Sequence, residues 1–145
     1  MFTGEGSIGY VLMGYPRLFE DTLESDVLMG SDDRDWIQEM CDVMATSMQL
    51  AVDQARAAMP TAQIVFANPI PAFWGGYGVG GAHESINRVI PLLTPGEVPF
   101  DVLPDHPTET WNAIGLSQQS FHPNVAGATL YAQVMRQALY DTWGL

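Results

Sequence analysis

The sequence predicts an α/β fold with a parallel sheet, because a long amphipathic segment lies between two short apolar ones. Residues 8–14 form a nearly continuous apolar run that ends at Gly-Tyr-Pro, and residues 63–67 form a second run that ends at Asn-Pro. Such runs are typical of strands that are buried on both faces of a parallel sheet. Strand, helix and strand in this order predict a βαβ unit with a right-handed crossover.

The helix of this unit is expected over residues 36–58, after possible caps at residues 31–33 and before Pro60. Its apolar residues recur every three or four positions, which predicts one face turned toward the core. We expect the methionines of this face to fill the core and not to hold a metal or cofactor. The predicted face consists of Trp36, Met40, Cys41, Met44, Met48, Ala51, Val52 and Ala55.

Beyond the second strand, Pro69 and Pro71 predict an extended exit. Residues 74–81 form a loop rich in glycine and aromatic side chains, a type that shapes pockets at the carboxyl ends of strands. Residues 86–89 are expected to form a turn of helix, residues 90–97 to be irregular and residues 99–109 to form a surface loop. The candidate pocket-lining residues are Phe73, Trp74, Tyr77 and His83.

A histidine, His122, lies at the junction between a loop and a predicted C-terminal helix. Pro123 suits a first helical turn, and the side chain of Asn124 or Ser120 can cap it. A histidine in this position is anchored on one side and free to point into a cleft, as a general base must be. A histidine that only caps or packs is the alternative. The buried face of the helix is predicted to contain Ala128, Tyr131, Ala132, Met135, Ala138 and Leu139.

The composition fits one globular domain over residues 1–145, with seventeen acidic residues against five arginines and a net charge of −12. This charge argues against nucleic acid and anionic membranes as partners, since both are bound through Lys and Arg. A neutral small molecule such as an ester is compatible with it. No apolar run approaches the roughly 18 residues of a membrane helix, and no signal peptide is visible in this chain.

No metal or cofactor is predicted. The glycines at 4, 6 and 9 fit G-x-G-x-x-G, but they precede a strand where a dinucleotide fingerprint follows one. His83, His106 and His122 show no spacing typical of metal ligands. Cys41 has no internal disulfide partner, so it leaves the cellular compartment open, and we expect it to be a small buried residue.

The segment Phe-His-Pro-Asn-Val-Ala-Gly at residues 121–127 resembles the histidine motif that opens the last helix of SGNH (GDSL-type) hydrolases. Ser120 before it is similar to many secreted actinobacterial members. The segment 14–19 resembles the Gly-Tyr-Pro segment of these esterases, and residues 72–84 resemble their loop toward the active site. The resemblance covers most of residues 8–140. It implies a three-layer α/β/α flavodoxin-like fold and a serine esterase or lipase acting on a small-molecule ester or lipid.

The resemblance also assigns roles. His122 matches the base that takes the proton of the catalytic serine. The family commonly has an aspartate three residues earlier, where this chain has Gln119, so the orienting group becomes the Gln119 amide or a backbone carbonyl of Gln118 or Gln119. The Gly-Asp-Ser and Gly-x-Asn-Asp motifs of the family do not occur in residues 1–145.

The chain is therefore expected to be the C-terminal part of one hydrolase domain, with the N-terminal part as its partner and negligible activity alone. The parent protein of such a fragment is expected to be a secreted one if it follows the members named above. A non-catalytic α/β module that binds a small ligand or carbohydrate at residues 74–81 is the alternative function.

Overall fold

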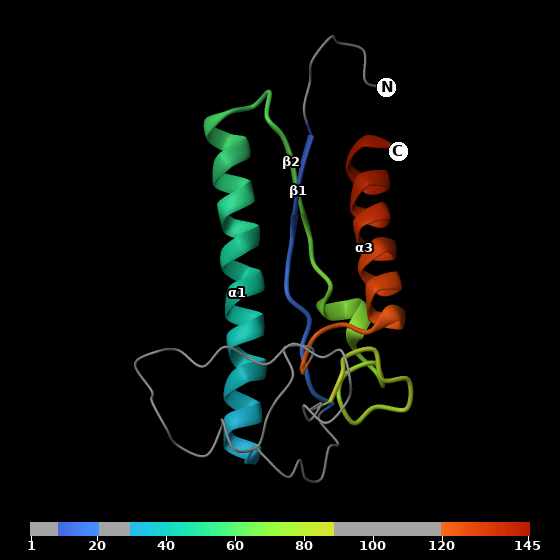
Figure 1. Ribbon diagram of the computed structural model, residues 1–145. Helices are drawn as coiled ribbons and strands as arrows, with labels where there is room; N and C mark the ends of the chain where they lie inside the picture. Colours follow the sequence, from blue (N-terminus) through green and yellow to red (C-terminus); the bar gives the residue numbers. More distant parts are fainter. Residues whose placement is uncertain (1–8, 21–29, 89–119) are drawn as a thin grey trace, which may run out of the picture.

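A computed structural model describes residues 9–20, 30–88 and 120–145, and it contains a parallel two-stranded sheet with a long helix on either side (Figure 1). Strand β1 (Gly9–Met13) pairs with strand β2 (Gln63–Ala67), in a register that places Gly9 opposite Gln63 and Met13 opposite Ala67. Helix α1 (Ser31–Ala58) connects the two strands. The prediction of an α/β fold with parallel strands is confirmed, and β2 has the predicted bounds.

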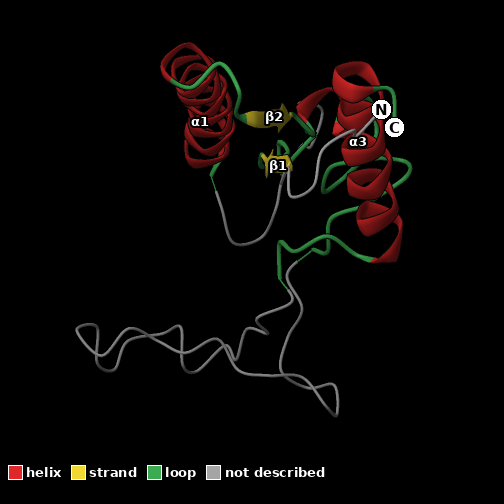
Figure 2. Cartoon of the chain, turned by 90° about the horizontal axis from the view of Figure 1, so that it is seen from above, coloured by secondary structure: helices red, strands yellow, loops and turns green. Residues whose placement is uncertain are grey.

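The two long helices lie on opposite sides of the sheet (Figures 1 and 2). Helix α1 packs on β2, whereas helix α3 (Val125–Trp143) contacts both strands and the short 3-10 helix η1 (Ile70–Phe73). The carboxyl ends of the strands, the loop after η1 and the start of α3 gather at one end of the molecule (Figure 1). This end is where a parallel α/β fold places its ligands.

Two groups of buried side chains hold these elements together. One lies between α1 and the sheet and contains Ala45, Val52 and Phe66. The other lies at the carboxyl ends of the strands and contains Phe19, Phe73, Val79 and Ile86. The ring of Phe73 meets that of Tyr131 on α3 edge to face, with centroids 5.2 Å apart. The second group therefore joins α3 to the loops at the carboxyl ends of the strands.

The predicted apolar face of α1 is only partly buried. Cys41 and Val52 are buried as predicted, but Trp36 is 60 % exposed, and Met40 and Met44 are exposed too. The buried face is rotated toward Ala45 and a polar residue, Gln38. The Gln38 side chain donates to the carbonyl oxygen of Phe19 (2.6 Å) and accepts from the amide of Leu18 (3.0 Å), which satisfies it in the core.

Strand β1 is also less buried than predicted: Gly9 and Tyr10 are exposed, and Val11 to Met13 are half-buried. The reason is that β1 has a single partner strand in the part of the chain that the structure describes. On α3, Tyr131, Ala138 and Leu139 are half-buried as expected, whereas the predicted face was wrong in including Ala128, Ala132 and Met135, which are exposed.

Two local predictions were wrong. The Pro69–Pro71 exit is not extended, because the amides of Ala72 and Phe73 both donate to the carbonyl oxygen of Pro69 and close η1. Ile86 does not begin a helical turn but forms an antiparallel bridge with Pro123. The predictions for residues 90–109, and those that concern Gln118, Gln119 and His106, lie outside the described residues. Neither α1 nor α3 is apolar enough over a sufficient length to span a membrane.

Candidate active site

His122 lies just before α3, and the N-cap of this helix fixes the backbone next to the histidine. Of the two predicted caps, the structure uses Asn124, whose Oδ1 accepts from the amide of Gly127 at 3.1 Å. The side-chain amide nitrogen of Asn124 donates to the carbonyl oxygen of Glu84 (2.9 Å), and the backbone amide of Asn124 donates to the carbonyl oxygen of Ser85 (3.0 Å). Asn124 therefore caps the helix and connects it to the backbone of residues 84 and 85.

The segment around His122 is joined to residues 85–87 on both sides. The amide of Asn87 donates to the carbonyl oxygen of His122 (2.8 Å), and the amide of Phe121 donates to that of Asn87 (3.0 Å). Gly127 allows the first turn of α3 to approach, because a Cβ there would lie 2.1 Å from the carbonyl oxygen of Ser85. The glycine of the motif therefore has a packing role next to the histidine.

The imidazole of His122 is exposed, and its Nδ1 lies 3.1 Å from the carbonyl oxygen of Ser120. Because a carbonyl oxygen only accepts hydrogen bonds, this contact requires the proton to be on Nδ1. The lone pair is then on Nε2, which is the form that a general base uses. The carbonyl oxygen in this contact belongs to Ser120. Gln118 and Gln119, which are predicted to orient the imidazole, lie outside the described residues.

Phe121 has a strained backbone directly before this histidine. Its φ of 60° is the only positive value at a non-glycine residue among those described. A bulky residue adopts this conformation only when its surroundings hold it there. The Phe121 ring packs edge to face on the buried ring of Phe19, with centroids 5.6 Å apart. The segment after β1 thus helps to set the direction of the His122 side chain.

The glycine-rich loop beside the histidine segment is held by two carboxylates. Glu20 Oε1 accepts from the amides of Gly76 (2.9 Å) and Gly78 (2.8 Å). Glu84 Oε1 accepts from the amide of Gly80 (2.7 Å) and pairs with Arg88. Glu84 follows His83, and the sequence allows this pair either to line a pocket or to lie on the surface; neither Glu20 nor Glu84 is predicted to hold the loop.

The four predicted pocket residues differ in burial and surroundings. Phe73 is buried in the core. Trp74 is 54 % exposed, and the Arg17 guanidinium lies 4.3 Å from the centre of its ring. The same guanidinium forms an ion pair with Asp42. Tyr77 and His83 are neighbours, with ring centroids 5.6 Å apart, and Tyr77 also packs against the buried group that contains Phe73.

A groove of about 590 Å³ lies elsewhere, between α1 and the carboxyl end of β2. None of the predicted site residues lines it. Its walls include Ala45, Leu50, Phe66, Asn68 and Ile70.

No family model, curated protein or solved structure matches this chain. The site must therefore be judged from its own geometry. Among residues 9–20, 30–88 and 120–145, no three His, Cys, Asp or Glu side chains are grouped so that they could hold a metal ion.

Two groups, the phenol of Tyr131 on α3 and the thiol of Cys41 on α1, have a raised pKa. Burial raises the pKa of the Tyr131 phenol to about 12, and the neighbouring Tyr15 and Cys41 add to the increase. Burial also raises the pKa of the Cys41 thiol, with a further contribution from Asp42, while Arg17 lowers it. A raised pKa disfavours the thiolate of Cys41, which is the nucleophilic form of a cysteine.

Proposed function

We propose that this chain is the histidine-bearing part of an SGNH-type serine ester hydrolase with a three-layer, flavodoxin-like sheet. Three features support the proposal: the motif at residues 121–127, the parallel strands with a helix on each side, and the start of α3, which follows His122, at the end of the molecule where the strands have their carboxyl ends. The observation that carries it is the contact between His122 Nδ1 and the Ser120 carbonyl, which leaves Nε2 free to accept a proton.

In the proposed reaction, Nε2 of His122 takes the proton of a serine hydroxyl as its oxygen attacks the ester carbonyl carbon. The tetrahedral intermediate collapses, the alcohol leaves with the proton from Nε2, and an acyl-serine remains. Water, deprotonated by the same nitrogen, then releases the carboxylic acid and restores the serine. The Ser120 carbonyl holds the ring in the productive orientation and accepts from Nδ1 throughout.

The serine and the oxyanion donors belong to a polypeptide that joins this chain, since residues 1–145 hold neither of the two family motifs that supply them. The net charge of −12 favours a neutral ester or lipid over an anionic one. A carbonyl partner carries no full charge, so it stabilises the imidazolium less than an aspartate does. We therefore expect slower turnover than in relatives that have the acid.

The test is to place a strand followed by Gly-Asp-Ser ahead of this chain in one polypeptide and to treat it with a fluorophosphonate. We expect the added serine to be labelled, and His122→Ala to abolish labelling. His83→Ala is the matched control, because that imidazole is also exposed but pairs with Tyr77. Labelling that survives His122→Ala would contradict the proposal. Residues 1–145 alone are expected to show negligible turnover of a p-nitrophenyl ester.

The alternative, a module that binds a carbohydrate or another small ligand, has one observation in its favour. Trp74 is exposed in a loop that Glu20 and Glu84 hold in place, and the Arg17 guanidinium lies over its ring. An exposed indole ring is a common platform for sugars. Quenching of tryptophan fluorescence by an oligosaccharide, lost in Trp74→Ala, would favour this function over hydrolysis.

A further inference from the structure

The protonation form of His122 depends on a turn of the backbone at the residue before it. Its Nδ1 lies 3.1 Å from the carbonyl oxygen of Ser120, two residues earlier in the chain. Phe121 lies between them with a φ of 60°, and this rotation sets the direction of the Ser120 carbonyl relative to the ring. Without this acceptor, the neutral imidazole is free to carry its proton on Nε2, which then has no lone pair for a serine proton.

The positive φ of Phe121 has a cost that other contacts must offset. A Cβ makes this conformation unfavourable, whereas glycine adopts it freely. Asn87 holds the backbone around the turn, through hydrogen bonds from the Phe121 amide (3.0 Å) and to the His122 carbonyl oxygen (2.8 Å). These bonds involve main-chain atoms, so they do not depend on the side chain at position 121. The contact that requires an aromatic ring there is the edge-to-face pair with Phe19, at 5.6 Å between centroids and 70° between planes.

Phe19 is held firmly enough to support this contact. Its side chain is 4 % exposed, within the buried group at the carboxyl ends of the strands. The backbone on either side of it pairs with Val79, which donates to the carbonyl oxygen of Leu18 (2.8 Å) and accepts from the amide of Glu20 (3.1 Å). The carbonyl oxygen of Phe19 itself accepts from Gln38 of α1 (2.6 Å). The ring that Phe121 meets is therefore fixed by both the glycine-rich loop and α1.

We infer that Phe19 is a positioning residue for His122, whose Nδ1–H form it maintains through the ring of Phe121. The inference rests on the proposed function, because this form matters to a base that uses Nε2. It adds a residue that the motif at 121–127 does not contain, since Phe19 follows β1 and lies about a hundred residues earlier in the chain.

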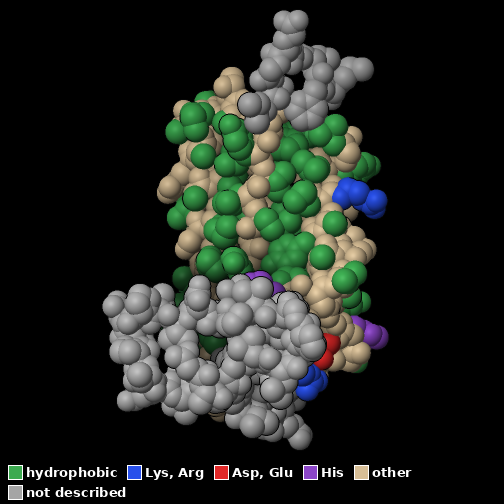
Figure 3. Space-filling view, in the orientation of Figure 1, with side chains coloured by type: hydrophobic (Ala, Val, Ile, Leu, Met, Phe, Trp, Pro, Cys, Tyr) green, Lys and Arg blue, Asp and Glu red, His purple; other side chains and the backbone are tan. Residues whose placement is uncertain are grey.

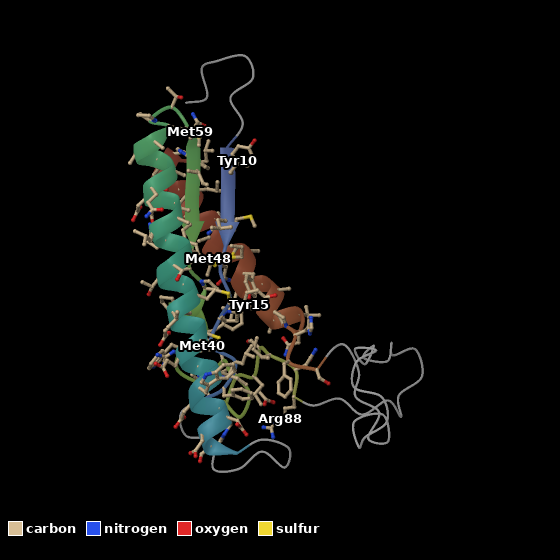
Figure 4. All side chains as sticks on the ribbon, turned by 90° about the vertical axis from the view of Figure 1, so that its left-hand side faces the viewer. Tyr10, Tyr15, Met40, Met48, Met59 and Arg88 are labelled. Atoms are coloured by element: carbon tan, nitrogen blue, oxygen red, sulfur yellow. The ribbon has the colours of Figure 1, made fainter. Side chains whose placement is uncertain are left out.

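The parts of this arrangement meet at one end of the molecule. Figure 3 shows histidine side chains on the surface toward the end where α3 starts. Figure 4 shows Arg88, the residue after Asn87, at the same end. The carboxyl end of β1, which leads to Phe19, lies there too (Figure 1). Parallel α/β folds place their reacting groups at this end, so a contact that sets the form of an imidazole there acts on the candidate site directly.

A contact that only packs the core is the alternative. Phe73 offers the comparison, because it belongs to the same buried group, is 2 % exposed and also meets an aromatic ring edge to face, that of Tyr131. Its ring contact does not involve the residues at 120–122. A role in packing predicts that Phe19 and Phe73 affect the fold alike, whereas the positioning role predicts that Phe19 alone affects the imidazole.

The experiment is nitrogen NMR of isotope-labelled residues 1–145 at about pH 8.5, where an ordinary imidazole is neutral. The shifts of the two ring nitrogens give the ratio of the Nδ1–H to the Nε2–H form. We expect the Nδ1–H form at His122, and Phe19→Leu or Phe121→Leu should lower the ratio about two- to tenfold, the range an aromatic pair contributes. The double variant should be no worse than either single one, because both remove the same contact. Phe73→Leu is the matched control and should leave the ratio unchanged.

A rescue separates positioning from packing. Phe121→Gly removes the ring but adopts a positive φ without the cost, so in the Phe19→Leu background it should return the ratio to within about twofold of the wild type. Phe121→Ala keeps the Cβ without the ring and should give no rescue. A loss of packing would be made worse by the smaller residue, so recovery with glycine is a result that only the backbone conformation explains. Circular dichroism checks that each variant folds.

Four outcomes would overturn the inference: the Nε2–H form in the wild type, an unchanged ratio in Phe19→Leu, an equal change in Phe73→Leu, and no recovery with glycine. Phe121 is half-buried, so Phe121→Leu against Phe121→Gly decides the matter even if Phe19→Leu fails to fold.

The readout needs neither an ester nor a serine, which keeps this test separate from that of the proposed function. Failure of fluorophosphonate labelling with the expected change of form would reject the hydrolase and keep the positioning role of Phe19. Labelling that depends on His122, together with a ratio that ignores Phe19, would do the reverse.

Discussion

The side-chain amide of Asn124 donates a 2.9 Å hydrogen bond to the carbonyl oxygen of Glu84, forty residues earlier in the chain. The Oδ1 of the same side chain caps α3 through the amide of Gly127. Asn124 is therefore both a helix cap and a cross-link between two loops. An aspartate would serve only the first of these roles, because it accepts hydrogen bonds but does not donate them when ionised.

Substitutions at Asn124 should separate the two roles. Asn124→Ala removes both and is expected to lower the free energy of unfolding by about 1–2 kcal/mol or more, since a lost cap alone costs this much. Asn124→Asp keeps the cap but sets a carboxylate against the Glu84 carbonyl. We expect it to destabilise the protein although Asp and Asn are equal caps. Urea unfolding measures both effects, and an Asp variant as stable as the wild type would contradict the role of the cross-link.

Gly127 should tolerate no side chain. Gly127→Ala places a Cβ at 2.1 Å from the Ser85 carbonyl oxygen, so either α3 or the segment around Ser85 must move. Overpacking of this kind costs about 1–3 kcal/mol, which exceeds the gain in helix propensity. Chemical shifts of His122 in NMR spectra should move as well. The exposed neighbour Ala128 is the control: Ala128→Gly should cost about 1 kcal/mol and leave His122 unchanged.

The sequence was sufficient to predict the parts of the fold that depend on local pattern. The bounds of β2, the end of α1 before Pro60, the burial of Cys41 and the cap at Asn124 follow from apolar runs and from the properties of proline and asparagine. The exposure of Trp36, Met40 and Met44 could not be predicted in this way. Periodicity identifies an apolar face, but whether that face is covered depends on which strands lie beside it.

The candidate site, too, could be predicted only in part from the sequence. The motif at 121–127 indicated His122, but the Ser120 carbonyl as its partner depends on the positive φ of Phe121, which no propensity predicts for phenylalanine. Likewise, Phe73 was assigned to a pocket because it lies next to a glycine-rich loop. The structure instead packs it against Tyr131, through a contact between elements that are far apart in the sequence.

The carboxylate of Glu20 should determine the order of the glycine-rich loop. Glu20→Ala removes the acceptor of the Gly76 and Gly78 amides, and we expect hydrogen exchange at both to become faster. Glu20→Gln keeps a carbonyl oxygen and should give an intermediate effect. Glu39→Ala, at an exposed position of α1, is the control and should leave both amides unchanged. Equal exchange in all three variants would show that the loop is held by other contacts.

Stability at high pH should depend on Tyr131. Its pKa is raised from 10.0 in the unfolded chain to about 12 in the fold, mainly by burial, so the folded state binds the proton more tightly. This contribution is fully present below pH 10 and is lost as the pH rises through 12. Cys41, with a pKa raised from 9.0, adds a loss of the same sign that begins at lower pH.

Urea unfolding between pH 8 and 11.5 tests this dependence. We expect Tyr131→Phe to flatten the fall in stability above pH 10, since phenylalanine has no proton to lose. Tyr140→Phe is the matched control, because Tyr140 lies on the same helix and is exposed, and it should leave the slope unchanged. The slope is the readout because the loss of a hydroxyl can change stability equally at every pH. Parallel curves for wild type and Tyr131→Phe would mean that the phenol titrates alike in the folded and unfolded chains.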